Sequence, residues 1–380
     1  MRVAVVGNGG REHAFRQVLS RTATVVPDDA DDADLYVIGP EQPLVDGVAD
    51  RLRADGKLVL GPGADGARLE GSKGWMKEVL RAAGVPTARS ATFATAEGVD
   101  AYLADLPSGA VVKTDYLAAG KGVLVSTDAD ALRNDARAKL AHGDVVIEEL
   151  LAGPELSVFA VCNGKDFVLL PPARDHKRVG DGDTGPNTGG MGAFSPVPDV
   201  DAAVEAAADM VDRTLGEFQR RGIDYRGILF AGLMLTPDGP KMLEYNVRLG
   251  DPEAQVVLPR FTSDLAELLA AAAAGDPLPP PTFTDAAAVT VVLAAEGYPV
   301  DVRTGDVIEG VDDAEALDGV TVFEAGVVRD DTGRLRTAGG RVLAVTALAA
   351  TLAEARERAY EAVQQISWPG MHYRKDIAAQ

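Results

Sequence analysis

The sequence predicts a protein of several domains that combines α/β and α+β architecture, and three observations support this prediction. The chain begins with a β-branched run at 2–6, a glycine turn and a helical pattern at 11–19, which together form a βα unit. Its middle alternates short apolar runs with helical patterns around a glycine-rich segment at 174–193. Its last part consists mostly of β-branched runs. We therefore expect domains at 1–73, 74–285 and 286–380, with a smaller closing-loop subdomain at about 87–150.

Length and charge limit the possible classes of protein. The chain has 380 residues, which is enough for two or three domains with ample core. Its 37 basic and 58 acidic residues give a net charge of −21, which argues against broad binding to nucleic acid or to anionic membranes. A solvated acidic surface is sufficient to explain this charge.

Cysteine content and hydrophobic runs exclude further classes. A single cysteine, Cys162, rules out an intrachain disulfide framework and a cysteine-based zinc site. The amino terminus lacks a long apolar region with a cleavage site, and the most apolar helix, 265–274, is too short to span a bilayer. We expect a cytoplasmic protein, a monomer or weak homodimer, with small-molecule substrates and no nucleic-acid or membrane partner.

The first domain has two candidate ligand-binding turns. Gly7-Asn8-Gly9-Gly10 joins a strand to a helix, so that backbone N–H groups and the helix dipole face an anion, although a purely structural turn explains the pattern nearly as well. Glu12 replaces the third glycine of a dinucleotide fingerprint. The next strand, 34–38, leads into Gly39-Pro40-Glu41 at the sheet edge where such domains bind ligands. Between them, 22–27 adds a short strand and 28–34 leaves no room for a helix.

The next segments predict a hairpin and a strand that bear charged residues. A strand at 57–60 and a helix at 69–83 precede strands at 110–113 and 123–126, which flank the small-residue loop 115–122 with Lys121. Lys121 and Lys113 are placed to reach two phosphates, whereas an ordinary hairpin with a solvated lysine is the alternative. The apolar strand 145–151 contains Glu148-Glu149, and buried carboxylates need donors such as nucleotide amino and hydroxyl groups.

The segment 174–193 has the most unusual composition in the chain. It contains six glycines among twenty residues and has no hydrophobic periodicity, so we expect a long functional loop between strands 156–162, 167–170 and the helix 202–221. Asp175, His176 and Lys177 open it with both signs of charge. This mixture suits a small zwitterion that needs partners for its carboxylate and its amine.

The strand at 241–246 predicts a metal site. Glu244 and Asn246 alternate with buried residues, so both side chains leave the same face and offer the hard oxygens that Mg²⁺ prefers. Arg248 continues the alternation and brings a guanidinium fork toward a phosphate. A polar edge strand that ends in a Gly-Asp-Pro turn is the alternative.

The remainder of the chain supplies scaffold. We expect a strand at 227–235, the alanine-rich helix 265–274, a linker at 277–281, strands at 289–293, 320–323 and 341–347 and a helix at 352–366. Polar turns at 303–306 and 373–376 are candidates to face the active site.

The order of these motifs resembles the phosphoribosylamine–glycine ligase family of ATP-grasp enzymes in purine synthesis. The resemblance rests on GNGGREHA, GPEQPLVDG, LEGSK, LAAGKGV, IEELL, DHKRVGDGDTGPNTGGMGA, EYNVRLGDPE, GYPVDVRTGDVIEG, GGRVLAVTAL and YRKDI, in family order over nearly the whole chain. It implies an ATP-grasp fold with a reduced N-terminal Rossmann-like domain and a small β-rich C-terminal domain.

The resemblance also implies roles for individual residues. Lys113 and Lys121 bind phosphates, Glu148, Glu149 and Leu151 form the adenine edge, and Glu155 holds the ribose. Glu244 and Asn246 hold Mg²⁺ or Mn²⁺, and Arg248 stabilises the transferred phosphoryl group of ATP. Asp175, Lys177 and the following glycine loop, which includes Gly189 and Gly190, hold glycine, and Asp251 is a further substrate-binding residue. Gly9, Gly10, Arg11, Glu12, Gly39, Pro40 and Glu41 bind phosphoribosylamine.

The implied reaction joins glycine to phosphoribosylamine through glycyl phosphate, with release of ADP and phosphate. The chain departs from the family in three places. A strand–helix unit with a Pro-Gly-Asn loop is cut to roughly 22–34, and Tyr116 and Pro154 are not the residues that the family usually has at those positions. The first departure keeps a related ligase with another amine acceptor as an alternative. A nucleotide-binding regulator without turnover and a nicotinamide dehydrogenase are less favoured, because the Glu244, Asn246 and Arg248 set is complete and Glu12 breaks the fingerprint.

Overall fold

The computed structural model describes residues 1–118 and 122–379. Its N-terminal sheet is parallel, with strand order β2-β1-β3-β4. The elements are β1 (Arg2–Val6), α1 (Gly10–Leu19), β2 (Thr24–Val26), β3 (Leu35–Ile38), α2 (Glu41–Val45), α3 (Val48–Ala54) and β4 (Val59–Leu60). As predicted, a short strand forms within 22–27 and no helix follows it before β3.

The predicted single helix at 69–83 is wrong, because the chain forms two helices there. They are α4 (Ala64–Gly71) and α5 (Lys73–Ala82). Ser72 between them is extended (φ −135°, ψ 113°), and its side chain accepts a hydrogen bond from the Trp75 amide. A serine that caps the second helix in this way must leave the helical conformation, and this ends the first helix.

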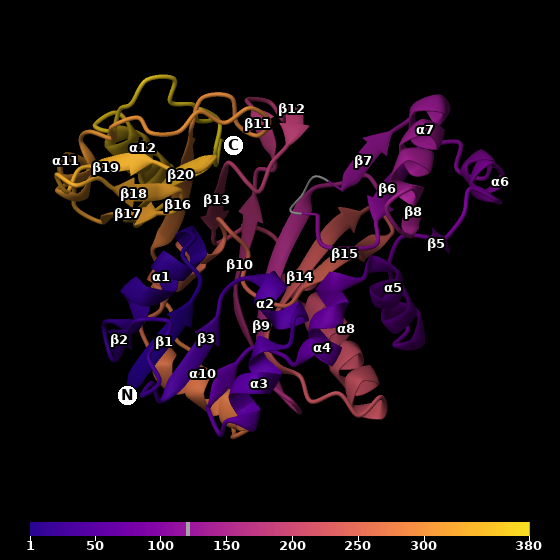
Figure 1. Ribbon diagram of the computed structural model, residues 1–380, viewed down its shortest axis with the longest axis horizontal. Helices are drawn as coiled ribbons and strands as arrows, with labels where there is room; N and C mark the ends of the chain where they lie inside the picture. The colour runs from indigo at the N-terminus through magenta and orange to yellow at the C-terminus, as the bar shows by residue number, and fades with distance from the viewer. Residues whose placement is uncertain (119–121, 380) are drawn as a thin grey trace.

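The segment at 87–150, predicted to be a closing-loop subdomain, has its own sheet and its own core. Its antiparallel strands have the order β5-β8-β6-β7, and two helices pack on them. The elements are β5 (Ser90–Phe93), α6 (Val99–Ala104), β6 (Ala110–Thr114), β7 (Val123–Ser126), α7 (Ala129–Leu140) and β8 (Val145–Glu149). The predicted strands at 110–113 and 123–126 are confirmed. Figure 1 shows this subdomain on the side of the molecule away from the C-terminal strands.

An eight-stranded sheet forms the centre of the molecule, with strand order β15-β14-β9-β10-β13-β16-β20-β17. Its strands are β9 (Glu155–Asn163), β10 (Phe167–Asp175), β13 (Gly192–Ser195), β14 (Arg226–Thr236), β15 (Gly239–Asn246), β16 (Ala287–Ala294), β17 (Val320–Glu324) and β20 (Arg341–Ala349). Since β13 pairs with β16, the last third of the chain continues the sheet that carries the predicted metal site. The helices α8 (Asp201–Arg220), α9 (Ala254–Val257) and α10 (Leu265–Ala274) are also part of this region.

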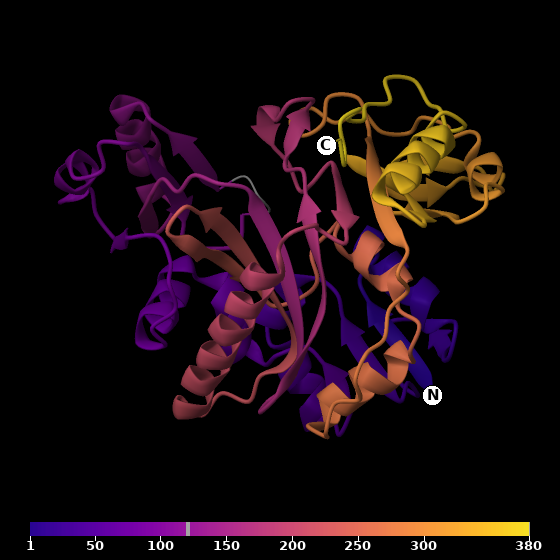
Figure 2. The same cartoon turned by 180° about the vertical axis from the view of Figure 1, so that it is seen from behind.

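The C-terminal region adds α11 (Val311–Glu315), β18 (Val327–Arg329), β19 (Leu335–Thr337) and α12 (Leu352–Val363). Helix α12 packs on β16 and β20, as the view from behind in Figure 2 shows. Along α12 the small residues Ala355, Ala359 and Ala362 are buried, which lets the helix approach the sheet closely.

The prediction that residues 174–193 form a long irregular loop is partly wrong. Strand β10 extends to Asp175, β11 (Arg178–Gly180) and β12 (Thr184–Asn187) form a hairpin, and β13 begins at Gly192. Gly182 (φ +64°) and Asp183 (φ +54°) make the turn of this hairpin in the left-handed region. Among the described residues, no helix is long and apolar enough to cross a membrane.

Candidate active site

Glu244 and Asn246 lie on β15 as predicted. The pairing of β14 with β15 has a bulge, so that Gly232 lies opposite Glu244 and Leu233 lies opposite Met242. After the bulge, the half-buried residues Glu244 and Asn246 alternate with buried Tyr245. Neither side chain makes a hydrogen bond to any residue that the structure describes. Burial raises the pKa of Glu244, but nearby Lys177 and Lys113 lower it more, so the pKa lies below its ordinary value.

This pair fits a divalent cation. A carboxylate and an amide oxygen on one face, both without hydrogen-bond partners in the described part of the chain, are the hard donors that Mg²⁺ accepts while it keeps water and phosphate ligands. Among the described residues, no group of three or more His, Cys, Asp or Glu is arranged to hold a metal. A cation here would therefore depend on these two side chains and on ligands from the substrate.

Two buried lysines lie next to the metal pair. Lys77 Nζ is 3.0 Å and Lys113 Nζ is 2.9 Å from the carboxylate of Glu148. Burial lowers the pKa of Lys77 to about 8, although Glu148 opposes the shift. Burial raises the pKa of Glu148, and the two lysines more than reverse this. The cluster keeps two cations fixed within electrostatic reach of Glu244.

Lys77 was not predicted from the sequence to be a site residue, although its place in the helical pattern of α5 was a signal for it. In α5 it lies three residues before buried Leu80 and on the same face, where a lysine requires a partner. Lys113 lies on β6, as predicted, and its role as a phosphate ligand stays a prediction. Lys121, the other predicted phosphate ligand, lies outside the described residues.

The predicted adenine edge divides between two environments. The carboxylate of Glu148 meets protein donors, Lys77 and Lys113, and not the nucleotide donors that its burial suggested. Glu149 is half-buried, accepts a 3.0 Å hydrogen bond from the Arg89 amide and lies 3.5 Å from Lys241. Leu151 follows β8 and is half-buried. The adenine-binding role of Glu149 and Leu151 stays a prediction, while the Glu148 carboxylate pairs with the two lysines.

The predicted glycine-binding residues lie at the end of β10. Asp175 pairs with Ala193 of β13, and Lys177 Nζ forms an ion pair with Glu155, the residue predicted to hold the ribose. Burial raises the pKa of Asp175. Burial alone lowers the pKa of Lys177, but Asp175, Glu155 and Glu244 raise it well above its ordinary value. An amine and a carboxylate would find both signs of charge here, next to the metal pair.

Arg248 does not present a free guanidinium. Its Nε is 3.0 Å from Glu41 and its Nη2 is 2.6 Å from Glu70, a residue that sequence reasoning missed. Burial raises the pKa of Glu41, but the positive charges of Arg248 and Arg11 outweigh this effect and lower the pKa to about 2. Val247 N–H donates to the second oxygen of Glu70 at 2.8 Å. The phosphoryl role of Arg248 stays a prediction, and the structure adds that its fork is held by two carboxylates.

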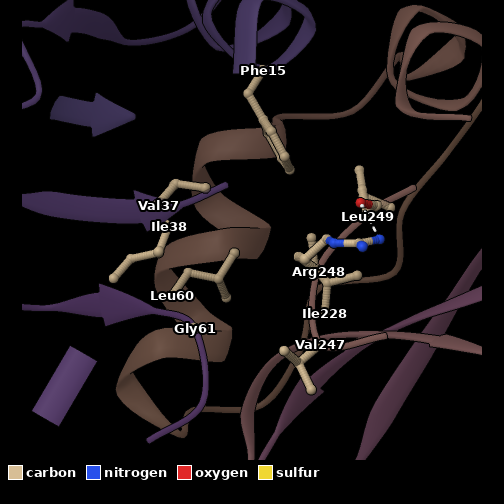
Figure 3. Close-up of a pocket in the computed structure, with 9 residues that line it drawn as sticks. All are labelled: Phe15, Val37, Ile38, Leu60, Gly61, Ile228, Val247, Arg248 and Leu249. Carbon is tan, nitrogen blue, oxygen red and sulfur yellow. Dashed lines mark hydrogen bonds between the residues drawn. The ribbon is translucent and has the colours of Figure 1, made fainter. Parts of the chain in front are cut away.

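The guanidinium of Arg248 also lines a small apolar cavity between the N-terminal sheet and the central sheet (Figure 3). Its Nη1 points back to the Leu249 carbonyl at 3.4 Å. The other lining residues are Phe15, Val37, Ile38, Leu60, Gly61, Ile228, Val247 and Leu249. Apart from Arg248 these are apolar residues or glycine, so the cavity is a packing gap between domains and not a polar substrate site.

Glu12 and Gly39 form the floor of the predicted acceptor site. The carboxylate of Glu12 accepts from the Gly9 amide at 2.6 Å and from Arg11 Nε at 2.8 Å, so it caps α1. A Cβ at Gly39 would lie 2.2 Å from Glu12 Oε1, so only glycine fits beside this carboxylate. Gly10 and Pro40 complete the two turns, and Glu41 begins α2. Both hydrogen bonds of the Glu12 carboxylate go to protein groups. Glu12 therefore shapes the site and is not placed primarily to bind a ligand.

Asp251 closes the other side of this site. Gln255 Nε2 donates to one oxygen at 2.8 Å, and Arg341 Nη2 lies 3.1 Å from the other. Burial raises the pKa of Asp251, but Arg341 and Arg11 lower it more, so the group is held as an anion. Arg341 also donates to the Gly189 carbonyl, and Gly190 (φ +112°) packs against Pro252. The structure thus brings together the predicted residues 9–12, 39–41, 189–190 and 251.

Family models match most of the chain. The phosphoribosylglycinamide synthetase ATP-grasp (A) domain matches residues 71–254, its C domain matches 288–380 and its N domain matches 28–70. The phosphoribosylamine–glycine ligase of Streptomyces coelicolor is 46% identical over 415 residues, with 100% of this chain and 99% of the relative covered. Because this chain has 380 residues, that relative carries about 35 residues without a counterpart here.

Comparison with solved structures agrees with the family models. The phosphoribosylamine–glycine ligase of Thermotoga maritima superposes with a TM-score of 0.89 at 35% identity, over 99% of this chain and 100% of that chain. A 2-oxoglutarate carboxylase biotin carboxylase domain from Hydrogenobacter thermophilus, solved with magnesium ADP, superposes with a TM-score of 0.73 at 16% identity, over 98% of this chain and 91% of that chain. The second likeness shows the shared ATP-grasp fold.

Proposed function

Since this chain belongs to the phosphoribosylglycinamide synthetase family and is an ATP-grasp ligase of purine biosynthesis, we propose how its residues join glycine to 5-phosphoribosylamine. The reaction consumes ATP and gives glycinamide ribonucleotide, ADP and phosphate. The observation that carries the assignment of the site is the juxtaposition of Glu244 and Asn246 with two buried lysines and the charged end of β10. Neither Glu244 nor Asn246 has a hydrogen-bond partner among the residues that the structure describes.

The first step is phosphoryl transfer to glycine. A carboxylate oxygen of glycine attacks the γ-phosphorus, the bond to the bridging oxygen breaks, and ADP leaves with that electron pair. Lys77 and Lys113 would neutralise phosphate charge, and Glu148 keeps both ammonium groups in place. Lys177 and Asp175 would bind the carboxylate and the amine of glycine. Glu244 and Asn246 would hold Mg²⁺ or Mn²⁺, whose chemistry is to neutralise phosphate oxygens.

The second step forms the amide. The amine of phosphoribosylamine attacks the carbonyl carbon of glycyl phosphate and loses a proton, and phosphate leaves with one former carboxylate oxygen. Asp251, held as an anion by Gln255 and Arg341, would orient the amine acceptor against the turn at Gly9. Closure of the subdomain at 87–150 would keep water from the acyl phosphate. We further propose that the enzyme works in the cytoplasm, where ATP is supplied.

A related amine is the second candidate acceptor. The crossover from β2 to β3 has no helix, and the Streptomyces relative has about 35 residues that this chain lacks. We infer that part of this difference lies in the shortened segment at 22–34, in the domain that carries the proposed acceptor residues Gly9 and Glu41. The residues proposed to bind the substrate glycine and ATP are the same for both candidate acceptors.

Phosphate release tests the proposal. Purified protein with ATP, Mg²⁺, glycine and freshly made phosphoribosylamine should release phosphate only when both glycine and the amine are present. Equal release without the amine would contradict amide formation. A panel of other primary amines in the same assay distinguishes phosphoribosylamine from a related amine as the acceptor. Phosphoribosylamine should give the highest kcat/KM.

A further inference from the structure

The β11–β12 hairpin is fastened to the last residues of the chain. We define the C-terminal strap as residues 372–378. Figures 1 and 2 show the hairpin beside this end of the chain, on the opposite side from α8 and α10. The hairpin residues 181–186 are exposed and it has only two strands, which makes it marginal on its own. Its position therefore depends on what holds it.

Arg374 is the centre of the attachment. Its side chain is only 1% exposed, and its Nε and Nη2 contact the two oxygens of Asp376, each at 2.7 Å. Its Nη1 reaches across to Asp183 at 2.6 Å and to the Arg178 carbonyl at 3.1 Å. A planar fork is needed to make four contacts in three directions, and a lysine offers no such geometry.

Other contacts fix the strap on both sides. On the hairpin side, Gly182 N–H donates to Asp376 at 2.8 Å, and the Lys375 amide donates to Asp181 at 2.8 Å. On the side of α12, Tyr360 Oη donates to the Arg374 carbonyl at 2.7 Å. The strap thus joins the hairpin turn to a helix of the C-terminal region.

The hairpin is continuous with the residues assigned to glycine. Lys177 immediately precedes β11, and its carbonyl accepts the Thr188 amide at 2.8 Å, which closes the base of the hairpin. Beyond the hairpin, Tyr298 Oη accepts the Gly189 amide at 3.1 Å and Arg341 donates to the Gly189 carbonyl. A shift of the hairpin would move Lys177 relative to Asp175.

We propose that the C-terminal strap sets the position of the glycine-binding residues, and that Arg374 is a positioning residue for glycine. The inference rests on the proposed function, in which Asp175 and Lys177 hold glycine. It gives the C-terminal region a role in the first chemical step, although its strap does not touch Glu244 or the lysine pair.

The test compares Arg374→Ala and Arg374→Lys with the unaltered protein. In Arg374→Ala, the KM for glycine should rise about tenfold or more, as expected when a buried charge-assisted network is lost, while the KM for ATP stays within about twofold. Amide hydrogen exchange in residues 180–187 should become faster. Arg374→Lys should give an intermediate KM for glycine, because it keeps the charge and loses the fork.

The matched control is Arg334→Ala, which removes an exposed arginine of the same region whose side-chain partners, among the described residues, are Asp330 and Thr332. It should change neither KM nor the hairpin exchange. Unchanged hairpin exchange in Arg374→Ala would overturn the inference, and so would an equal rise of both KM values. A failure of the proposed function is distinct, since the unaltered protein would then release no phosphate with glycine and the amine, whereas hairpin exchange would still report on the strap.

Discussion

At the residue scale, the site is a set of charges that are paired in the folded protein. Glu148 holds two lysines, Glu41 and Glu70 hold Arg248, and Glu155 holds Lys177. Buried charges are retained only with partners, so the carboxylates fix the cations that a triphosphate would meet. The oxygens of Glu244 and Asn246 are the exception that points to a cation, because no residue within 1–118 or 122–379 forms a hydrogen bond with them.

Sequence reasoning reached some of these residues and not others. The alternation of Glu244 and Asn246 with Tyr245 was sufficient to predict their common face, because strand periodicity is local. Glu70 and Lys77 were missed, because their partners Arg248 and Glu148 are more than seventy residues away and pairing across that distance leaves no local pattern.

Neighbouring glutamates give a residue-scale prediction. Glu148→Ala leaves two buried lysines without their shared carboxylate, so we expect the free energy of unfolding to fall by about 3–5 kcal/mol at pH 7. Urea unfolding measures this loss. The adjacent Glu149→Ala removes a half-exposed carboxylate 3.5 Å from Lys241 and should cost about 1 kcal/mol or less. Similar losses in the two variants would show that Glu148 does not hold the lysines.

At the element scale, the strands were easier to predict than the interruptions. Strands such as Arg2–Val6 and 123–126 follow from β-branched runs. The break at Ser72 was missed, since a helical pattern runs through it and only the contact of its side chain with the Trp75 amide shows the cap. The hairpin at 178–187 was missed although its Asp-Gly turn was visible, because its strands carry no apolar alternation.

The break at Ser72 gives an element-scale prediction. Ser72→Ala removes the N-cap of α5 and should lower the free energy of unfolding by about 1 kcal/mol. Thermal or urea unfolding measures the change. Ser20→Ala is the control, because the exposed Ser20 hydroxyl donates only to the Gln17 carbonyl at the end of α1 and caps no N-terminus. A loss in Ser20→Ala as large as in Ser72→Ala would contradict the capping role.

At the scale of the whole molecule, the order of motifs predicted the fold more fully than any single segment. The chain matches its family from 28 to 380 with few gaps between the models, and the ATP-grasp fold follows from that order. The continuity of the central sheet from β15 to β17 was not predicted, because the pairing of β13 with β16 joins strands almost one hundred residues apart. This pairing places the C-terminal region against the site.

The central claim is that the glycine carboxylate takes the γ-phosphoryl group of ATP before it meets the amine. Glycine labelled with ¹⁸O in its carboxylate tests this claim most directly, by mass spectrometry of the phosphate released in a complete reaction. The account predicts one ¹⁸O atom in each phosphate, and no labelled phosphate from Glu244→Ala, whose turnover should collapse. Unlabelled phosphate from a protein that still forms the amide would contradict it.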